Sequence, residues 1–285
     1  MIETKNFEVM SERLRREDRV RFLSVQFTPP EYRADLLGLL AFNLELRDAC
    51  IGVSEPAIGQ LRLKWWYDAL AGIFNGNPPR HPVALGLAEV VTRRKLRRAT
   101  FEQWIEAEAD GLADGRVDKI SDFETRMANT SGMLIDQLMT VIGIDDTSAG
   151  EVGRGVAQGC GLTYMIRSTA AEAARGRFNY PHALCQRHGL DGDAVIRWRP
   201  GRETPKGLVE AVTEIAERAA QRLGEARRLH QQLPKRALPL MLVAVSASAD
   251  LKRLSKPEIN PLTVFTRPDP WLVARLTWAV WRKRY

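Results

Sequence analysis

Apolar residues recur at helical spacing along almost the whole of this chain of 285 residues, and segments typical of β-strands are nearly absent. The pattern is clear after Pro30, a helix-opening proline that is followed by Leu36, Leu39, Leu40 and Phe42. No internal repeat, low-complexity tract or shift in composition marks a linker. The sequence therefore predicts an all-α fold, a single-domain bundle of helices.

Capping residues and helix-breaking turns divide the chain into individual predicted helices. Thr100 is a suitable N-cap for the helix that follows it, with Gln103 as its capping-box partner. The polar residues 145–148 and the glycine- and arginine-rich residues 187–205 are expected to be loops. The other predicted helices cover residues 30–46, 54–75, 81–96, 123–143, 151–174, 206–232, 234–254 and 270–285.

Composition bounds the class of protein. Hydrophobic residues make up 45% of the chain and charged residues 27%, which is ample for a full core. No window has the roughly 18 uncharged apolar residues that a membrane span needs. The polar N-terminus lacks the apolar region of a secretory signal, so we expect a cytoplasmic protein. Cys50, Cys160 and Cys185 show no CxxC spacing and are expected to be reduced.

The formal net charge of +7 suits acidic partners, such as diphosphates, anionic lipid head groups or nucleic acid. The charge alone does not choose among them. No zinc-finger spacing, RNA-binding signature or DNA-reading motif is present. We therefore expect no nucleic-acid partner.

Two segments carry motifs that resemble the squalene/phytoene synthase family. In that family a helix reading L-T-N-I-L-R-D-x-x-x-D leads into an R-G-R turn, and an earlier helix reads R-L-x-W-W-x-x-x-L. The matching residues of the later segment are Leu162, Thr163, Ile166, Arg167, Arg175, Gly176, Arg177 and Pro181. The matching residues of the earlier helix are Arg62, Leu63, Trp65, Trp66 and Leu70.

The resemblance implies a helical bundle of the isoprenoid synthase type around a central cavity. It covers residues 20–285 as one domain and leaves residues 1–19 as an N-terminal extension. In the family, two boxes of aspartates face each other across the cavity, with the acids at i and i+4 on one helix face. These acids hold Mg²⁺, which binds the diphosphate of an isoprenoid substrate.

This sequence departs from the family pattern at both boxes. Alignment with the first box places Arg47 and Ile51 at the aspartate positions, with Asp48 between them. The second box gives Ser168 and Glu172. A cation at position 47 repels a divalent metal, and one remaining acid cannot hold a metal cluster. We therefore predict no metal and no cofactor, and we hypothesise that an ion pair between Arg47 and Glu172 replaces the metal bridge.

The same departures resemble a degenerate branch of the family that includes a mitochondrial complex I assembly factor. The first hypothesis is thus a non-catalytic binding or assembly protein, with a respiratory-complex subunit as its partner, at the periphery of the inner membrane. One alternative is an active Mg²⁺-dependent prenyl diphosphate transferase with unusual ligands. The other is a carrier that holds a polyprenyl lipid in the cavity.

Three arginines are the candidate contacts to an isoprenoid diphosphate or a lipid phosphate. Arg167, Arg175 and Arg177 belong to the retained helix and turn, and arginine makes bidentate contacts to phosphate. Salt bridges at a helix end are an equally good explanation. The acid pairs Asp145 with Asp146 and Asp110 with Asp114 are interpreted as solvated rather than metal-binding.

The C-terminal residues 270–285 form a second candidate surface. Tryptophans alternate there with basic residues, as in Trp278, Trp281, Arg282 and Lys283. A short helix with this composition suits an anionic membrane surface. The favoured interpretation is nevertheless a final bundle helix with a solvated basic end.

Overall fold

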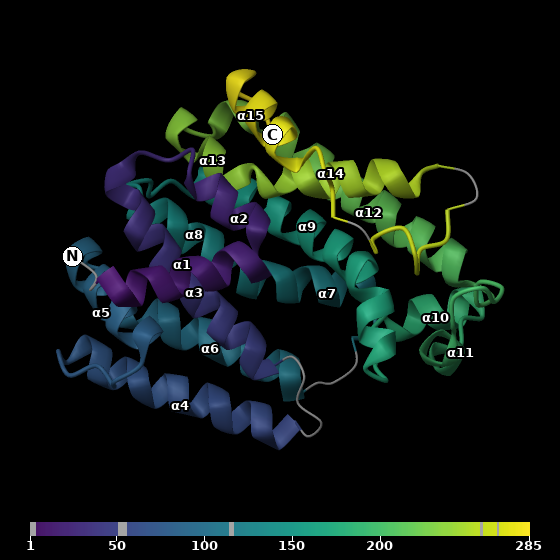
Figure 1. Ribbon diagram of the computed structural model, residues 1–285, viewed down its shortest axis with the longest axis horizontal. Helices are drawn as coiled ribbons and strands as arrows, with labels where there is room; N and C mark the ends of the chain where they lie inside the picture. The colour runs from purple at the N-terminus through teal and green to yellow at the C-terminus, as the bar shows by residue number, and fades with distance from the viewer. Residues whose placement is uncertain (1–3, 51–55, 114–116, 257–258, 267) are drawn as a thin grey trace.

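The computed structural model describes residues 4–50, 56–113, 117–256, 259–266 and 268–285 (Figure 1). Helices, turns and irregular connections account for these residues, and none of them lies in a strand. The predicted all-α class is therefore confirmed. No helix within these ranges has the length and apolar character needed to cross a bilayer.

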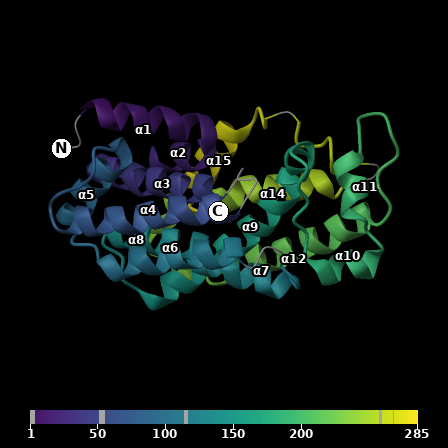
Figure 2. The same ribbon diagram turned by 90° about the horizontal axis from the view of Figure 1, so that it is seen from below.

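The helices are distributed over the whole chain. In chain order they are α1 (Thr4–Glu17), α2 (Arg19–Val25), α3 (Pro30–Cys50), α4 (Pro56–Phe74), α5 (Pro82–Arg94), α6 (Arg98–Ala113), α7 (Ile120–Met127), a π-helical turn (Ala128–Gly132), α8 (Met133–Val141), α9 (Thr147–Ala174), α10 (His182–His188), α11 (Gly192–Arg197), α12 (Leu208–Arg228), 3₁₀ turns (His230–Gln232 and Lys235–Ala237), α13 (Leu238–Met241), α14 (Val243–Leu254) and α15 (Leu272–Trp281). Both views place α5 and α11 at opposite ends of the molecule (Figures 1 and 2).

Several predicted helix boundaries are wrong for local reasons. The helix α6 begins at Arg98, so Thr100 lies inside its first turn and does not cap it. The helix predicted over 123–143 begins at Ile120 and contains the π-helical turn. The region 187–205, predicted as a loop, contains α11, which Asp191 caps by accepting a hydrogen bond from the backbone N–H of Asp193.

The acidic residues before α9 form a helix cap. The side chain of Asp146 accepts hydrogen bonds from the backbone N–H groups of Ser148, at 2.8 Å, and Ala149, at 3.4 Å. These bonds satisfy N–H groups that have no partner within the helix. The helix therefore begins at Thr147, four residues earlier than predicted, and the expected loop is shorter.

Aromatic packing joins α3, α4 and α6 in the main core. The fully buried ring of Phe42 lies 5.3 Å from Trp66 and 5.5 Å from Trp104, both in edge-to-face geometry. Trp66, from the R-L-x-W-W segment, is thus a core residue, whereas its neighbour Trp65 is 44% exposed. Of the two tryptophans of the motif, Trp66 therefore lies in the core, and Trp65 packs against it from the surface, with ring centroids 4.9 Å apart.

Small residues let α9 and α12 approach closely. A methyl group placed at Gly159 would lie 2.6 Å from Cγ of Leu223, which is closer than real contacts allow. The long helix α9 runs through the middle of the bundle, next to α7, α12 and α14 (Figure 1). It therefore carries the residues of the second box into the centre of the molecule.

The predicted extension, residues 1–19, includes α1. Its residues Met10 and Leu14 are buried in the same core cluster as α3 and α5. The predicted boundary at residue 19 falls at the start of α2. The helix α1 therefore packs as part of the bundle, and its C-terminal end reaches the central cavity.

Candidate functional site

A cavity of about 660 Å³ lies at the centre of the bundle. Its walls come from α1, α2, α3, α6, α7, the π-helical turn, α9 and α14, with residues 177–180 and the start of α15. Apolar side chains such as Phe123, Met165 and Leu272 line it together with charged ones. The predicted site residues Arg47, Arg167, Ser168, Glu172 and Arg177 all line it. Thus the two box regions do face one common space.

The first box region ends α3 and is occupied by ion pairs. The Nη2 atom of Arg47 lies 3.4 Å from a carboxylate oxygen of Glu17 and 3.4 Å from one of Asp48. Glu17 is the last residue of α1, so its pairing with Arg47 joins α1 to α3. Ile51, the other predicted box position, lies outside the described residues.

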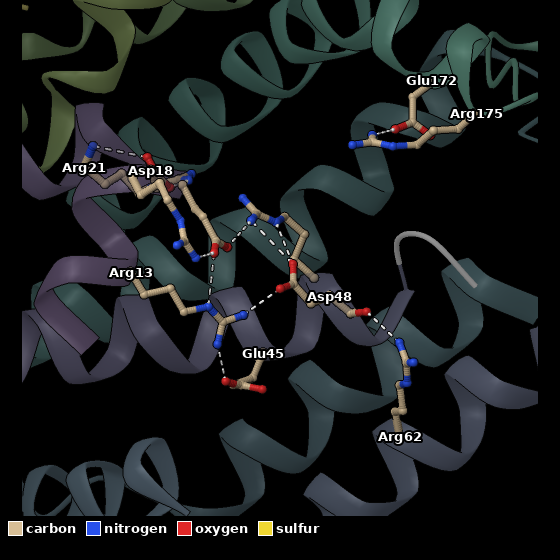
Figure 3. A network of polar contacts seen from close by, with 11 residues as sticks. Arg13, Asp18, Arg21, Glu45, Asp48, Arg62, Glu172 and Arg175 are labelled. Atoms are coloured by element: carbon tan, nitrogen blue, oxygen red, sulfur yellow. Dashed lines mark hydrogen bonds and ion pairs between the residues drawn. The ribbon is translucent and has the colours of Figure 1, made fainter. Parts of the chain in front are cut away.

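A second arginine from α1 completes this network. Arg13 donates hydrogen bonds to Glu45 and, at 2.5 Å, to Asp48 (Figure 3). Burial lowers the pKa of the Arg13 guanidinium, but the surrounding carboxylates outweigh burial and raise the pKa above its usual value. The acids near the first box are therefore paired with guanidinium groups of this same chain.

The second box region has its own, separate ion pairs. Glu172 accepts hydrogen bonds from Arg175 at 2.9 Å and from Arg177 at 2.7 Å. Burial raises the pKa of Glu172, but these arginines outweigh it and bring the pKa below its usual value. The hydroxyl of Ser168 donates to the carbonyl oxygen of Met165, at 3.2 Å. Ser168 thus presents no charge to the cavity.

The hypothesis of an ion pair between Arg47 and Glu172 is wrong. The carboxylates of α1 and α3 bind Arg47, and the turn after α9 supplies the partners of Glu172. Figure 3 shows Glu172 and Arg175 as a pair apart from the network of Arg13 and Asp48. Each side of the cavity therefore neutralises its own charges.

Arg167 faces a buried acid that the sequence analysis did not single out. Its Nη1 atom lies 2.9 Å from Asp250 of α14, whose side chain is 5% exposed. Burial raises the pKa of Asp250, against the opposing effect of Arg167 and Arg253. A lone aspartate in the apolar segment 236–254 was the available signal, since aspartate is rarely buried without a partner.

The donor set does not fit a magnesium cluster. Mg²⁺ needs several oxygen ligands, and carboxylates are its usual protein ligands. Asp48 and Glu172 each accept hydrogen bonds from arginines, and Arg47 adds a positive charge to the first box region itself. Within the described residues, no three histidine, cysteine, aspartate or glutamate side chains are grouped to hold a metal ion.

Two polar groups of the cavity wall are buried without full compensation by hydrogen bonds or opposite charges. The Nη2 atom of Arg177 is buried and makes no hydrogen bond. Burial raises the pKa of Glu108, on α6, to about 7. The wall thus holds one unsatisfied donor and one carboxylate that is partly protonated near neutral pH.

The remaining predicted candidates lie elsewhere. Arg175 is exposed and contacts Glu172 from outside, and Asp110 is exposed at the end of α6. Asp114 lies outside the described residues. His188, the last residue of α10, contacts Glu214 of α12 at 2.8 Å.

Sequence reasoning missed the contribution of α1. Arg13 and Glu17 supply the charges that occupy the first box region, yet both fall in the predicted extension. Their i,i+4 spacing was the only local signal, and such spacing is common on exposed helices. Their partners on α3 lie 30 to 35 residues away in the sequence.

Comparison with known proteins finds similar sequences over most of the chain. A family model described as squalene/phytoene synthase matches residues 14–279. The chain is 29% identical over 275 residues to NADH dehydrogenase (ubiquinone) complex I, assembly factor 6 of Rattus norvegicus, covering 96% of this chain and 81% of the relative. The protein of that name from Homo sapiens is 28% identical over 249 residues, which are 87% of this chain and 74% of the relative.

Solved structures show the same fold. A dehydrosqualene synthase crystallised in complex with a ligand superposes with a TM-score of 0.81 at 14% identity, over 98% of this chain and 96% of that one. A squalene synthase of Alicyclobacillus acidocaldarius has a TM-score of 0.71 at 19% identity, over 87% of this chain and 92% of that one. The predicted isoprenoid synthase type of bundle is confirmed.

Proposed function

Because the chain belongs to the squalene/phytoene synthase family, we propose that it is a non-catalytic member that acts in the assembly of a respiratory complex. The observation that carries this proposal is the occupation of both box regions by ion pairs within the chain. Arg13 and Arg47 neutralise Asp48, and Arg177 neutralises Glu172. A diphosphate leaving group would meet no metal there to stabilise its charge.

The curated relatives support the assembly role. The relatives from Rattus norvegicus and Homo sapiens both carry the name of a complex I assembly factor, and the alignment covers most of each of them. A fold can host unrelated functions, so the fold alone would not favour assembly over catalysis. The changed charges at the cavity and the names of the relatives point in the same direction.

Deletion of the gene in the source organism tests the assembly role. We expect loss of assembled complex I on native gels, with loss of NADH:ubiquinone oxidoreductase activity, and recovery on expression of the wild-type chain. If the protein instead catalysed isoprenoid synthesis, adding the isoprenoid product to the deletion strain would restore complex I. Normal amounts of assembled complex I in the deletion strain would contradict the proposal.

The cavity itself supports a second candidate function, the holding of a polyprenyl lipid or an isoprenoid diphosphate. Its volume is within the range of small-molecule sites, and apolar Phe123 and Met165 share its wall with the unsatisfied Nη2 atom of Arg177. Native mass spectrometry of gently purified protein would then reveal a bound lipid. The variant Ala247→Phe, which adds bulk to the wall, is expected to lose it.

The rival function is an active Mg²⁺-dependent prenyl diphosphate transferase. Mn²⁺ binding followed by electron paramagnetic resonance tests whether the cavity keeps the required geometry. We expect no binding to the wild-type chain, and a gain of binding in the double variant Arg47→Asp, Ser168→Asp, which places two carboxylates opposite each other. Tight Mn²⁺ binding by the wild-type chain would favour the rival.

A further inference from the structure

The last helix, α15, has one buried face and one face that projects from the bundle. Leu272, Leu276 and Ala279 are buried against α2 and α14. Trp278 and Trp281 point to the other side and are 56% and 71% exposed. The helix lies at the periphery of the molecule (Figure 1). The favoured sequence interpretation, a plain bundle helix, therefore accounts for only one face.

The exposed face carries large aromatic side chains. Trp271, at the start of the helix, is 66% exposed, and Val273 is 48% exposed. The rings of Trp278 and Trp281 contact each other in a tilted arrangement, with centroids 4.8 Å apart. These side chains extend over the whole length of α15. We call this surface, with Trp271, Trp278 and Trp281, the tryptophan face.

Basic residues flank the tryptophan face. Arg282, Lys283 and Arg284 follow the helix and are all exposed. The guanidinium of Arg282 lies 5.7 Å from the ring centroid of Trp278. Arg275 is paired with Asp269, at 3.2 Å, so these two charges offset each other. The surface therefore has a positive balance from the three consecutive basic residues.

We propose that the tryptophan face docks the protein onto an anionic lipid bilayer. Tryptophan favours the interface between water and acyl chains, because its ring is apolar and its N–H is polar. Arginine and lysine beside it attract lipid phosphates. A helix at the periphery with an exposed aromatic face needs no complementary groove, which suits a planar lipid surface better than a protein partner.

The cavity gives this docking a structural consequence. Pro268, Asp269 and Leu272, at the start of the α15 region, form part of the cavity wall. Docking through α15 therefore brings one side of the cavity close to the bilayer. The docking itself does not depend on the assembly role or on the absence of catalysis.

Co-sedimentation of the full chain with vesicles tests the proposal. We expect the wild-type chain to bind vesicles of phosphatidylcholine mixed with phosphatidylglycerol, and to bind pure phosphatidylcholine far less. The variant Trp278→Ser, Trp281→Ser is expected to weaken binding by about tenfold or more, since insertion of apolar surface contributes to interfacial binding. The matched control Ile58→Ser, Leu61→Ser removes exposed apolar residues of α4 and should bind like the wild type.

A charge variant separates the two contributions. Arg282→Glu, Arg284→Glu is expected to weaken binding to the anionic vesicles by about tenfold or more, because basic residues at such a surface attract the anionic lipid head groups. The control Arg80→Glu, Lys206→Glu makes the same change in net charge at exposed sites in connections between other helices. It should weaken binding much less.

Tryptophan fluorescence adds a direct readout of insertion. Lipids with brominated acyl chains should quench the wild-type emission, and the quenching should fall in Trp278→Ser, Trp281→Ser. Circular dichroism confirms that each variant is folded. The proposal is overturned if the wild type binds neither kind of vesicle, if it binds both equally, or if the α15 variants bind as well as their controls.

Discussion

The guanidinium of Arg167 donates a 2.9 Å hydrogen bond to the buried carboxylate of Asp250, across the wall of the central cavity. Arg167 belongs to the retained family motif, whereas Asp250 comes from α14. The pairing occupies an arginine that would otherwise be available to an anion. It also makes the anion affinity of the cavity depend on a residue that the motif does not contain.

Replacement of Asp250 by asparagine should raise the affinity of the cavity for inorganic diphosphate. The substitution keeps the shape of the side chain and removes the charge that holds Arg167. We expect an increase of about tenfold, because one hydrogen bond to a charged group contributes on the order of 1.5 kcal/mol. Isothermal titration calorimetry without metal measures it. Asp136→Asn, which removes the partner of Arg154 away from this cavity, should leave the affinity unchanged.

A second prediction concerns Glu124, which joins α7 to α12. Its carboxylate is 3% exposed and accepts paired hydrogen bonds from Arg218 and Arg222, at 2.6 to 2.8 Å. Glu124→Gln should lower the free energy of unfolding by about 3 kcal/mol, since it breaks a buried charge network. Urea denaturation measures this. The control Glu225→Gln, at a more exposed partner of Arg222, should cost less than about 1 kcal/mol.

The same residue, Glu124, should make the free energy of unfolding fall at acid pH. Burial raises the pKa of Glu124, but the hydrogen bonds from Arg222 and Arg218 outweigh it and lower the pKa below its usual value. The stabilisation is therefore present above the pKa of the unfolded chain and is lost as the pH falls toward the lower, folded pKa. Glu124→Gln should flatten this loss; an unchanged acid profile would contradict the account.

Glu108 should act in the opposite sense. Its pKa is raised by burial to about 7, so the folded state binds the proton more tightly than the unfolded state. The free energy of unfolding should therefore fall as the pH rises from about 4.5 to about 7. Glu108→Gln should remove this fall and add no more than about 3 kcal/mol at alkaline pH. Urea denaturation across this range checks it, with the exposed Glu106→Gln on the same helix as control.

Two glycines should respond to alanine in opposite directions. At Gly159 the new methyl group would meet Leu223 at 2.6 Å and the carbonyl oxygen of Ala219 at 3.1 Å. We expect destabilisation of about 1–3 kcal/mol, because α9 and α12 must separate. At Gly224, on α12, the methyl group meets nothing within 4 Å, and helix propensity should stabilise the chain by about 0.5–1 kcal/mol. Equal effects in thermal or urea denaturation would contradict this packing.

The helical fold could be predicted because it depends on local periodicity. The apolar spacing in α3 and the proline at its start are sequence properties that the structure confirms. Helix ends were predicted less well, since they depend on which polar side chain reaches a free N–H group. Asp146 caps α9, whose start was predicted four residues too late. Asp191 caps α11, a helix that was not predicted.

The charged site could be predicted only in part. The replacement of acids at Arg47 and Ser168 follows directly from alignment with the family motif. The partners do not, because Glu17 and Asp250 lie on helices that only the tertiary fold brings to the cavity. The proposed pair of Arg47 and Glu172 failed for this reason, since nearer carboxylates and guanidinium groups were available to each.

The most direct test of the central claim is turnover. Purified chain is incubated with Mg²⁺ and farnesyl or geranylgeranyl diphosphate, and both released diphosphate and prenyl products are measured beside an active squalene synthase. Arg47 is paired with Glu17, and Glu172 is paired with Arg177. With both box regions occupied in this way, we expect neither diphosphate release nor any joined C30 or C40 product. Formation of such a product by the wild-type chain, and its loss in Glu172→Gln, would contradict the account.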